Sequence, residues 1–152
     1  MVLNLMKYIP NPRNHEFFFD NYFTSYPLMV YLKGKGIRAT GTIRENRTQK
    51  CPTMDSKTMK KMNKGSSDYR FDQQNQVLCV KWKDNNVCSM LTNYDTVAPF
   101  HYVKRWSKAT KSKEYILQPK LFSTYNSGIG GVDLHDQCIS LYRVSVKEKK
   151  WW

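Results

Sequence analysis

The chain has 152 residues, 40% of them apolar, which is enough for one globular domain with a hydrophobic core. It carries 25 lysine and arginine residues against 12 aspartate and glutamate residues, a formal net charge of +13. This surplus favours a polyanionic partner, nucleic acid before an anionic membrane, and no apolar run reaches the roughly 18 residues of a transmembrane helix.

The first predicted elements lead to an aspartate. Residues 2–9 have the pattern of a short helix end that prolines close. Three consecutive phenylalanines, residues 17–19, are typical of a strand that is covered on both faces. Asp20 follows where this strand stops, and ligand-handling groups collect at the carboxyl ends of strands in open α/β sheets. A turn or helix-capping aspartate is the alternative, and for Asp20 taken alone the pattern favours it.

A helix and a second strand are expected next. Ser25 or Thr24 would cap a helix whose first turn holds Pro27 and which two glycines end. The alternation of side chains over residues 37–43 predicts a strand. Gly41 within it indicates a close approach of backbone or side chain.

The middle of the chain is basic and poor in apolar periodicity. Residues 33–64 contain ten basic residues and two acidic ones, and most of this zone is predicted to be a loop or an insertion. Three short apolar segments between residues 69 and 94 predict a small antiparallel meander. Residues 104–113 are predicted to form a second basic loop.

A second pair of acids lies near the end of the chain. Three glycines, residues 128, 130 and 131, precede a predicted helix that holds Asp133 and Asp136 on one face. Both carboxylates would then project from near the start of the helix. Compensation of the helix macrodipole is the structural alternative for them.

These acids, in so basic a chain, suggest one chemistry above others. Phosphoryl transfer on nucleic acid by two Mg²⁺ ions needs several carboxylates, because hard divalent cations prefer oxygen ligands. Lysine and arginine around such a site would hold the flanking phosphates.

Three segments resemble motifs of the piggyBac-type DDE transposases, a family that includes domesticated piggyBac element-derived proteins. They occur in the family's order and over almost the whole chain. The first is D-N-Y-F-T-S-Y-P-L at residues 20–28, the second G-T-I-R-E-N-R at residues 41–47, and the third Y-N followed by G-G-V-D-L-H-D-Q within residues 125–137.

The resemblance implies an RNase H-like catalytic core of α/β class that excises and joins DNA with Mg²⁺ or Mn²⁺. Asp20 matches the second catalytic aspartate, Asp133 the third, and Asp136 the further acid on the same helix. Residues 1–44 and 116–152 would form a partial core, and residues 45–115 a basic, β-containing insertion domain. The implied partners are transposon ends and target DNA, with a homodimer for the complete protein and no membrane, and the expected location is the nucleus.

The chain also departs from the family pattern. The family's first catalytic aspartate lies well upstream of the first motif, and only nineteen residues precede Asp20. We therefore expect this chain alone to be inactive, as a fragment or remnant of a transposase. Residues 15–19 and 37–43 would lack the central strands with which they pair, which leaves unpaired edges.

A non-catalytic, domesticated DNA-binding module is the alternative function, and a basic structural or RNA-associated protein is a third. The cations expected to contact DNA come from both basic zones. They are Lys33, Lys35, Arg38, Arg44, Arg47, Lys104 and Arg105.

Overall fold

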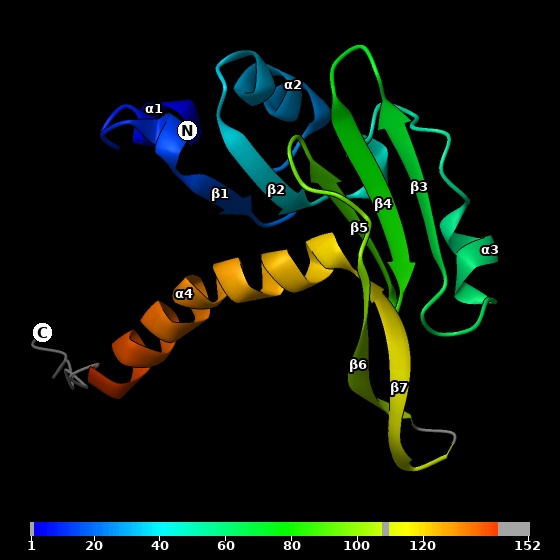
Figure 1. Ribbon diagram of the computed structural model, residues 1–152. Helices are drawn as coiled ribbons and strands as arrows, with labels where there is room; N and C mark the ends of the chain where they lie inside the picture. The colour runs from blue at the N-terminus through cyan, green and yellow to red at the C-terminus, as the bar shows by residue number, and fades with distance from the viewer. Residues whose placement is uncertain (1, 108–109, 143–152) are drawn as a thin grey trace, which may run out of the picture.

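The computed structural model describes residues 2–107 and 110–142, and for residues 132–136 and 142 it describes the backbone only. Its main feature is a five-stranded sheet of order β1-β2-β5-β4-β3 (Figure 1). The strands are β1 (Glu16–Phe19), β2 (Arg38–Thr42), β3 (Ser67–Asp72), β4 (Val77–Lys83) and β5 (Val87–Thr92). β1 and β2 are parallel, whereas the other neighbours are antiparallel.

The expectation of unpaired strands is wrong for β2 and holds on one side of β1. β2 lies between β1 and β5, because residues 40–42 pair with residues 90–92 of the meander. β1 is the edge of the sheet. The predicted meander is confirmed, and its last strand continues the sheet that β1 and β2 begin. The division into a core and an insertion domain stays a prediction.

The helices on one face of the sheet follow their local signals. α1 (Val2–Met6) and a 3₁₀ turn (Pro12–Asn14) precede β1. α2 (Tyr26–Gly34) begins after Ser25, whose Oγ accepts a hydrogen bond from the Leu28 amide, and Pro27 lies in its first turn. A second 3₁₀ turn (Glu45–Arg47) and α3 (Ser56–Lys60) interrupt the first basic zone.

The second basic zone is a hairpin, not the predicted loop. β6 (Phe100–Ser107) pairs with β7 (Ser112–Pro119) in an antiparallel ribbon that is separate from the main sheet. Its charged residues lie on both faces, since Lys104 is followed by Arg105 and Lys113 by Glu114, and this obscured the period of two.

The last helix starts earlier than expected. α4 runs from Lys120 to Tyr142 and contains all three glycines that were expected to precede it. Asp133 and Asp136 therefore belong to the interior of a long helix. Compensation of the macrodipole at a helix start does not explain them, because that effect is confined to the first turn.

Two hydrophobic clusters cover opposite faces of the sheet. Val77 and Cys79 of β4 pack with Met29 and Leu32 of α2, whereas the alternate β4 residues Leu78, Val80 and Trp82 face the ribbon and the start of α4. β4 is thus buried on both sides, and the molecule has a helix layer, a sheet and a layer formed by the ribbon and α4 (Figure 1).

Candidate functional site

Asp20 lies at the predicted strand-to-helix junction, directly after β1. Its Oδ1 accepts hydrogen bonds from the backbone amides of Tyr22, at 2.8 Å, and Phe23, at 3.4 Å. The Thr24 hydroxyl donates to the Asp20 carbonyl oxygen at 2.7 Å and closes the turn. The capping alternative is therefore part of what Asp20 does. The side chain is exposed, and none of the described residues hydrogen-bonds to Oδ2.

The turn is packed tightly against the neighbouring strand. Phe19 is aligned with Gly41 of β2, and a Cβ at Gly41 would lie 2.2 Å from Thr24 Oγ1. This confirms the close approach that a glycine within a strand predicts. A larger residue at position 41 would displace the hydroxyl that closes the Asp20 turn.

Two arginines of the second motif hold the same turn. Because β1 and β2 are parallel, they end at the same edge of the sheet, and the residues after both strands meet there. Arg44 Nε donates to Asn21 Oδ1 at 3.1 Å. Arg47 Nη1 donates to the carbonyl oxygens of Asn21, at 3.2 Å, and Tyr22, at 2.5 Å. The first two motifs thus form one contiguous structure, in which two arginine side chains hold the turn that carries Asp20.

A buried lysine fixes the segment that carries these arginines. Lys81 of β4 is 1% exposed, and its Nζ donates to Glu45 Oε1 at 2.5 Å and to the Met54 carbonyl oxygen at 2.8 Å. The hydrogen bond from Lys81 lowers the pKa of Glu45. Sequence reasoning missed this role, although a lysine that interrupts the apolar run of residues 77–82 was a signal for it.

Asn93 was also missed, and it ties α2 to the sheet. Its Oδ1 accepts from the Ala39 amide at 2.8 Å, and its Nδ2 donates to the carbonyl oxygens of Ile37, at 2.9 Å, and Met29, at 3.3 Å. The residue is 2% exposed. A lone asparagine after a strand carries no local sign of such partners.

The third motif brings α4 against β1. Tyr125 donates its hydroxyl to the Phe19 carbonyl oxygen at 3.1 Å, and its ring meets that of Phe18 edge to face. A Cβ at Gly128 would lie 2.3 Å from the Phe18 ring, so this glycine lets the helix approach the strand. Residue 128 lies beside residue 18 and residue 125 beside residue 19, so α4 runs back along β1 (Figure 1).

The predicted metal ligands are placed only in part. Asp20 lies on the exposed turn, whereas Asp133 and Asp136 follow on α4 with side chains that lie outside the described residues. No cluster of three or more His, Cys, Asp or Glu side chains suited to a metal ion occurs in the described part of the chain. The three-carboxylate site stays a prediction.

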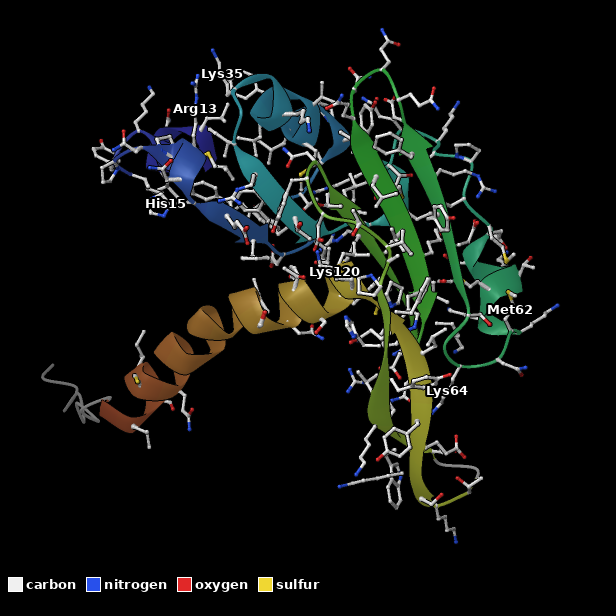
Figure 2. All side chains as sticks on the ribbon, in the orientation of Figure 1. Arg13, His15, Lys35, Met62, Lys64 and Lys120 are labelled. Atoms are coloured by element: carbon white, nitrogen blue, oxygen red, sulfur yellow. The ribbon has the colours of Figure 1, made fainter. Side chains whose placement is uncertain are left out.

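Arg44 and Arg47 hold the Asp20 turn, and the other five predicted DNA-contacting cations divide into two groups. Lys33, Arg38 and Arg105 are engaged within the molecule: Lys33 Nζ donates to the Asn93 carbonyl oxygen at 2.9 Å, Arg38 pairs with Glu16 at 3.1 Å, and Arg105 pairs with Asp84 at 3.1 Å. The ammonium groups of Lys35 and Lys104 lie over the rings of Tyr31 and Tyr115, at 5.7 and 5.2 Å, and both lysines are exposed. Figure 2 shows Lys35 beside Arg13, which donates to the Lys35 carbonyl oxygen at 3.0 Å.

Comparison with known proteins gives the family. The family model described as Transposase IS4 matches residues 1–152. The chain belongs to the piggyBac-related transposases. It is 39% identical over 138 residues to human PiggyBac transposable element-derived protein 2, and 35% identical over 142 residues to human PiggyBac transposable element-derived protein 3. These alignments cover 91% and 93% of this chain but 23% and 24% of the relatives.

A solved structure shows the same fold. It is a cryo-EM structure of a piggyBac transposase synaptic complex with hairpin DNA, with a TM-score of 0.64 and 22% identity over 91% of this chain and 26% of that one. The mixed α/β architecture is therefore that of a segment of piggyBac transposase. This chain spans about a quarter of the length of these relatives. In the part that the structure describes, no helix is long and apolar enough to cross a membrane.

Proposed function

We propose that this chain is the part of a piggyBac-like transposase that binds DNA and contributes carboxylates to divalent-metal-dependent excision and joining of DNA. Its RNase H-like character would lie in β1, α2, β2 and α4. The observation that carries the proposal is the Asp20 turn, where an exposed carboxylate at the end of a parallel strand lies beside Arg44 and Arg47. Basic side chains there suit the phosphates of a substrate.

The metal ligands of the complete site would include Asp20, Asp133 and Asp136, beside the first catalytic aspartate that the family pattern requires. Asp20 suits this role because its side chain is exposed, its Oδ1 is held by backbone amides, and none of the described residues hydrogen-bonds to its Oδ2. Carboxylate oxygens are the ligands that Mg²⁺ and Mn²⁺ prefer. Two such ions stabilise the attacking and leaving oxygens of a phosphoryl transfer. The chain by itself is expected to be inactive, and the complete protein would act in the nucleus as a homodimer.

Duplex binding provides the first test. The chain should bind duplex DNA with an affinity that falls steeply with salt, the slope being about 0.9 for each phosphate contacted. Arg44→Gln and Lys35→Gln should each reduce this slope by about one. The control for the loss of one positive charge is Lys7→Gln, because Lys7 is exposed. Lys81 would not serve, because it is buried and structural. Absence of salt-dependent binding would overturn the proposal.

Metal dependence provides the second test. Mn²⁺ should raise the melting temperature of the chain or its affinity for DNA, and Asp20→Asn should remove this effect. With Mg²⁺ or Mn²⁺ and DNA that carries a transposon end, the chain should show no strand cleavage. Robust cleavage that Asp133→Ala abolishes would contradict the expected inactivity.

A domesticated, non-catalytic DNA-binding module is the second candidate. It is favoured by the structural use of Asp20, whose Oδ1 already caps a turn. In this case DNA affinity would fall with salt as before, but Asp20→Asn and added Mn²⁺ would change nothing.

A further inference from the structure

The β6–β7 ribbon has two different faces. Opposed residues of an antiparallel pair share a face, and the register places Lys104 opposite Tyr115 and Trp106 opposite Lys113. With Tyr102, these residues form what we call the outer ribbon face. Its aromatic members are all exposed, Tyr102 by 73%, Trp106 by 53% and Tyr115 by 62%, and both lysines are exposed as well.

The opposite face of the ribbon is already occupied. Val103 and Ile116 pack against the cluster that contains Trp82, and the Trp82 indole donates to the Leu117 carbonyl oxygen at 2.8 Å. Lys64 lies beside the ribbon (Figure 2), and its Nζ donates to the Trp106 carbonyl oxygen at 3.1 Å. The ribbon is thus anchored through one face, and the aromatic rings of the other are held outward.

Aromatic and cationic side chains alternate on the outer ribbon face. Tyr115 is the diagonal neighbour of both Tyr102 and Trp106, so the backbone positions that carry the three rings form a zigzag, and diagonal positions are typically about 7–8 Å apart. This is about twice the 3.4 Å spacing of successive nucleotides in a DNA strand, which leaves room for one base between neighbouring rings. Lys104 lies between Tyr102 and Trp106 on β6, with its ammonium 5.2 Å from the centre of the Tyr115 ring, and Lys113 lies opposite Trp106. Both lysines are exposed at the edge of the row of rings, where they can contact phosphates.

We propose that the outer ribbon face binds single-stranded DNA by stacking unpaired bases on Tyr102, Trp106 and Tyr115. Base–aromatic stacking together with lysine contacts to the backbone is how proteins bind single strands without reading their sequence. A protein partner fits less well, since lysine is depleted in protein interfaces and this face carries two lysines and no acid. The inference rests on the proposed function in that its ligand is DNA, but it concerns unpaired bases.

The test compares variants of the full chain by fluorescence anisotropy with a labelled single strand of about 12 nucleotides, within the usual site size. Trp106→Ala and Tyr115→Ala should each weaken binding about 5- to 100-fold, and Trp106→Phe should retain it, because any aromatic ring stacks. Tyr8→Ala is the matched control, because Tyr8 is 86% exposed and lies near α1, away from the ribbon. An abasic strand should compete poorly. All these side chains are exposed, so the melting temperature should change little.

Duplex DNA separates this inference from the proposed function. The ribbon inference is overturned if Trp106→Ala weakens binding to single-stranded and duplex DNA no more than Tyr8→Ala does. It is also overturned if an abasic strand competes as well as a strand with bases. In both cases the proposed binding of duplex DNA can still hold. If single strands bind through the ribbon and duplex DNA does not bind, the proposed function fails and the ribbon inference stands. Lys104→Gln combined with Lys113→Gln should reduce the salt slope for single strands by about 1.4, and an unchanged slope would also count against the inference.

Discussion

Gly128 and Gly130 lie on the same helix and allow a matched test of how α4 meets β1. A Cβ at residue 128 would lie 2.3, 2.4 and 2.7 Å from three atoms of the Phe18 ring, whereas a Cβ at residue 130 would meet nothing within 4 Å. Optimal carbon–carbon contacts are about 3.5–4.0 Å, so Gly128→Ala forces the ring or the helix to move by more than 1 Å. The ring is held edge to face by Tyr125.

The expected magnitudes follow from two effects. Replacing glycine by alanine inside a helix stabilises it by about 1 kcal/mol at either position. Overpacking a fitted interface costs about 1–3 kcal/mol, and only Gly128→Ala incurs this cost. The free energies of unfolding of the two variants should therefore differ by about 1–3 kcal/mol, which for a chain of this size is a difference in melting temperature of about 2–12 °C.

Urea denaturation and thermal melting followed by circular dichroism would measure this difference. Gly130→Ala should be more stable than the parent chain, and Gly128→Ala less stable than Gly130→Ala. In a Phe18→Ala background the ring is gone, so Gly128→Ala should become as favourable as Gly130→Ala. The interpretation of Gly128 as a contact glycine is refuted if the two alanine variants are equally stable in the parent chain.

Three further predictions concern buried or titrating groups. Asn93→Ala should lower the free energy of unfolding by about 2–5 kcal/mol, because it leaves buried backbone groups without partners; a loss below 0.5 kcal/mol in urea would contradict this. Lys81→Met should lower the free energy of unfolding by about 1–3 kcal/mol and speed amide hydrogen exchange across residues 45–54. Unchanged exchange would count against the anchoring role of Lys81. Hydrogen bonds from Tyr26 and Asn75 lower the pKa of Asp72 to about 2. The ionised Asp72 therefore adds to the free energy of unfolding above its unfolded pKa near 3.9, and this stabilisation is lost as the pH falls toward 2. Asp72→Asn should make the urea midpoint depend less on pH in this acid range. An unaltered pH dependence would disprove the linkage.

Local signals predicted the segment from β1 to β2 well. The phenylalanine run, the Ser25 cap with Pro27, and the alternation before Gly41 each act within a few residues, and the structure places β1, α2 and β2 there. Asp20 was expected at the strand end and lies there. These features depend on neighbours in sequence, so no knowledge of distant partners was needed.

The errors arose where a distant partner decides the structure. The glycines of α4 looked like helix breakers, yet Gly128 is required by Phe18, more than a hundred residues away, and the helix continues through it. The β6–β7 hairpin was missed because charged residues occur on both of its faces, so the inner residues Val103 and Ile116, which pack on the cluster of Trp82, show no clear alternation in the sequence. The roles of Lys81 and Asn93 likewise depend on backbone groups that only the fold brings near.

Asp20 combines a structural and a proposed chemical role, and the geometry shows how to separate them. Its Oδ1 accepts backbone hydrogen bonds, while Gly41, Thr24 and Arg47 hold the turn from other sides. Asparagine at this position keeps an oxygen that can accept those bonds and removes only the negative charge, whereas alanine removes both. The asparagine variant therefore tests the carboxylate, and the alanine variant tests the turn. Because the turn is fixed by the protein itself, a metal would find the Asp20 oxygens already in place and would have to recruit the carboxylates of α4.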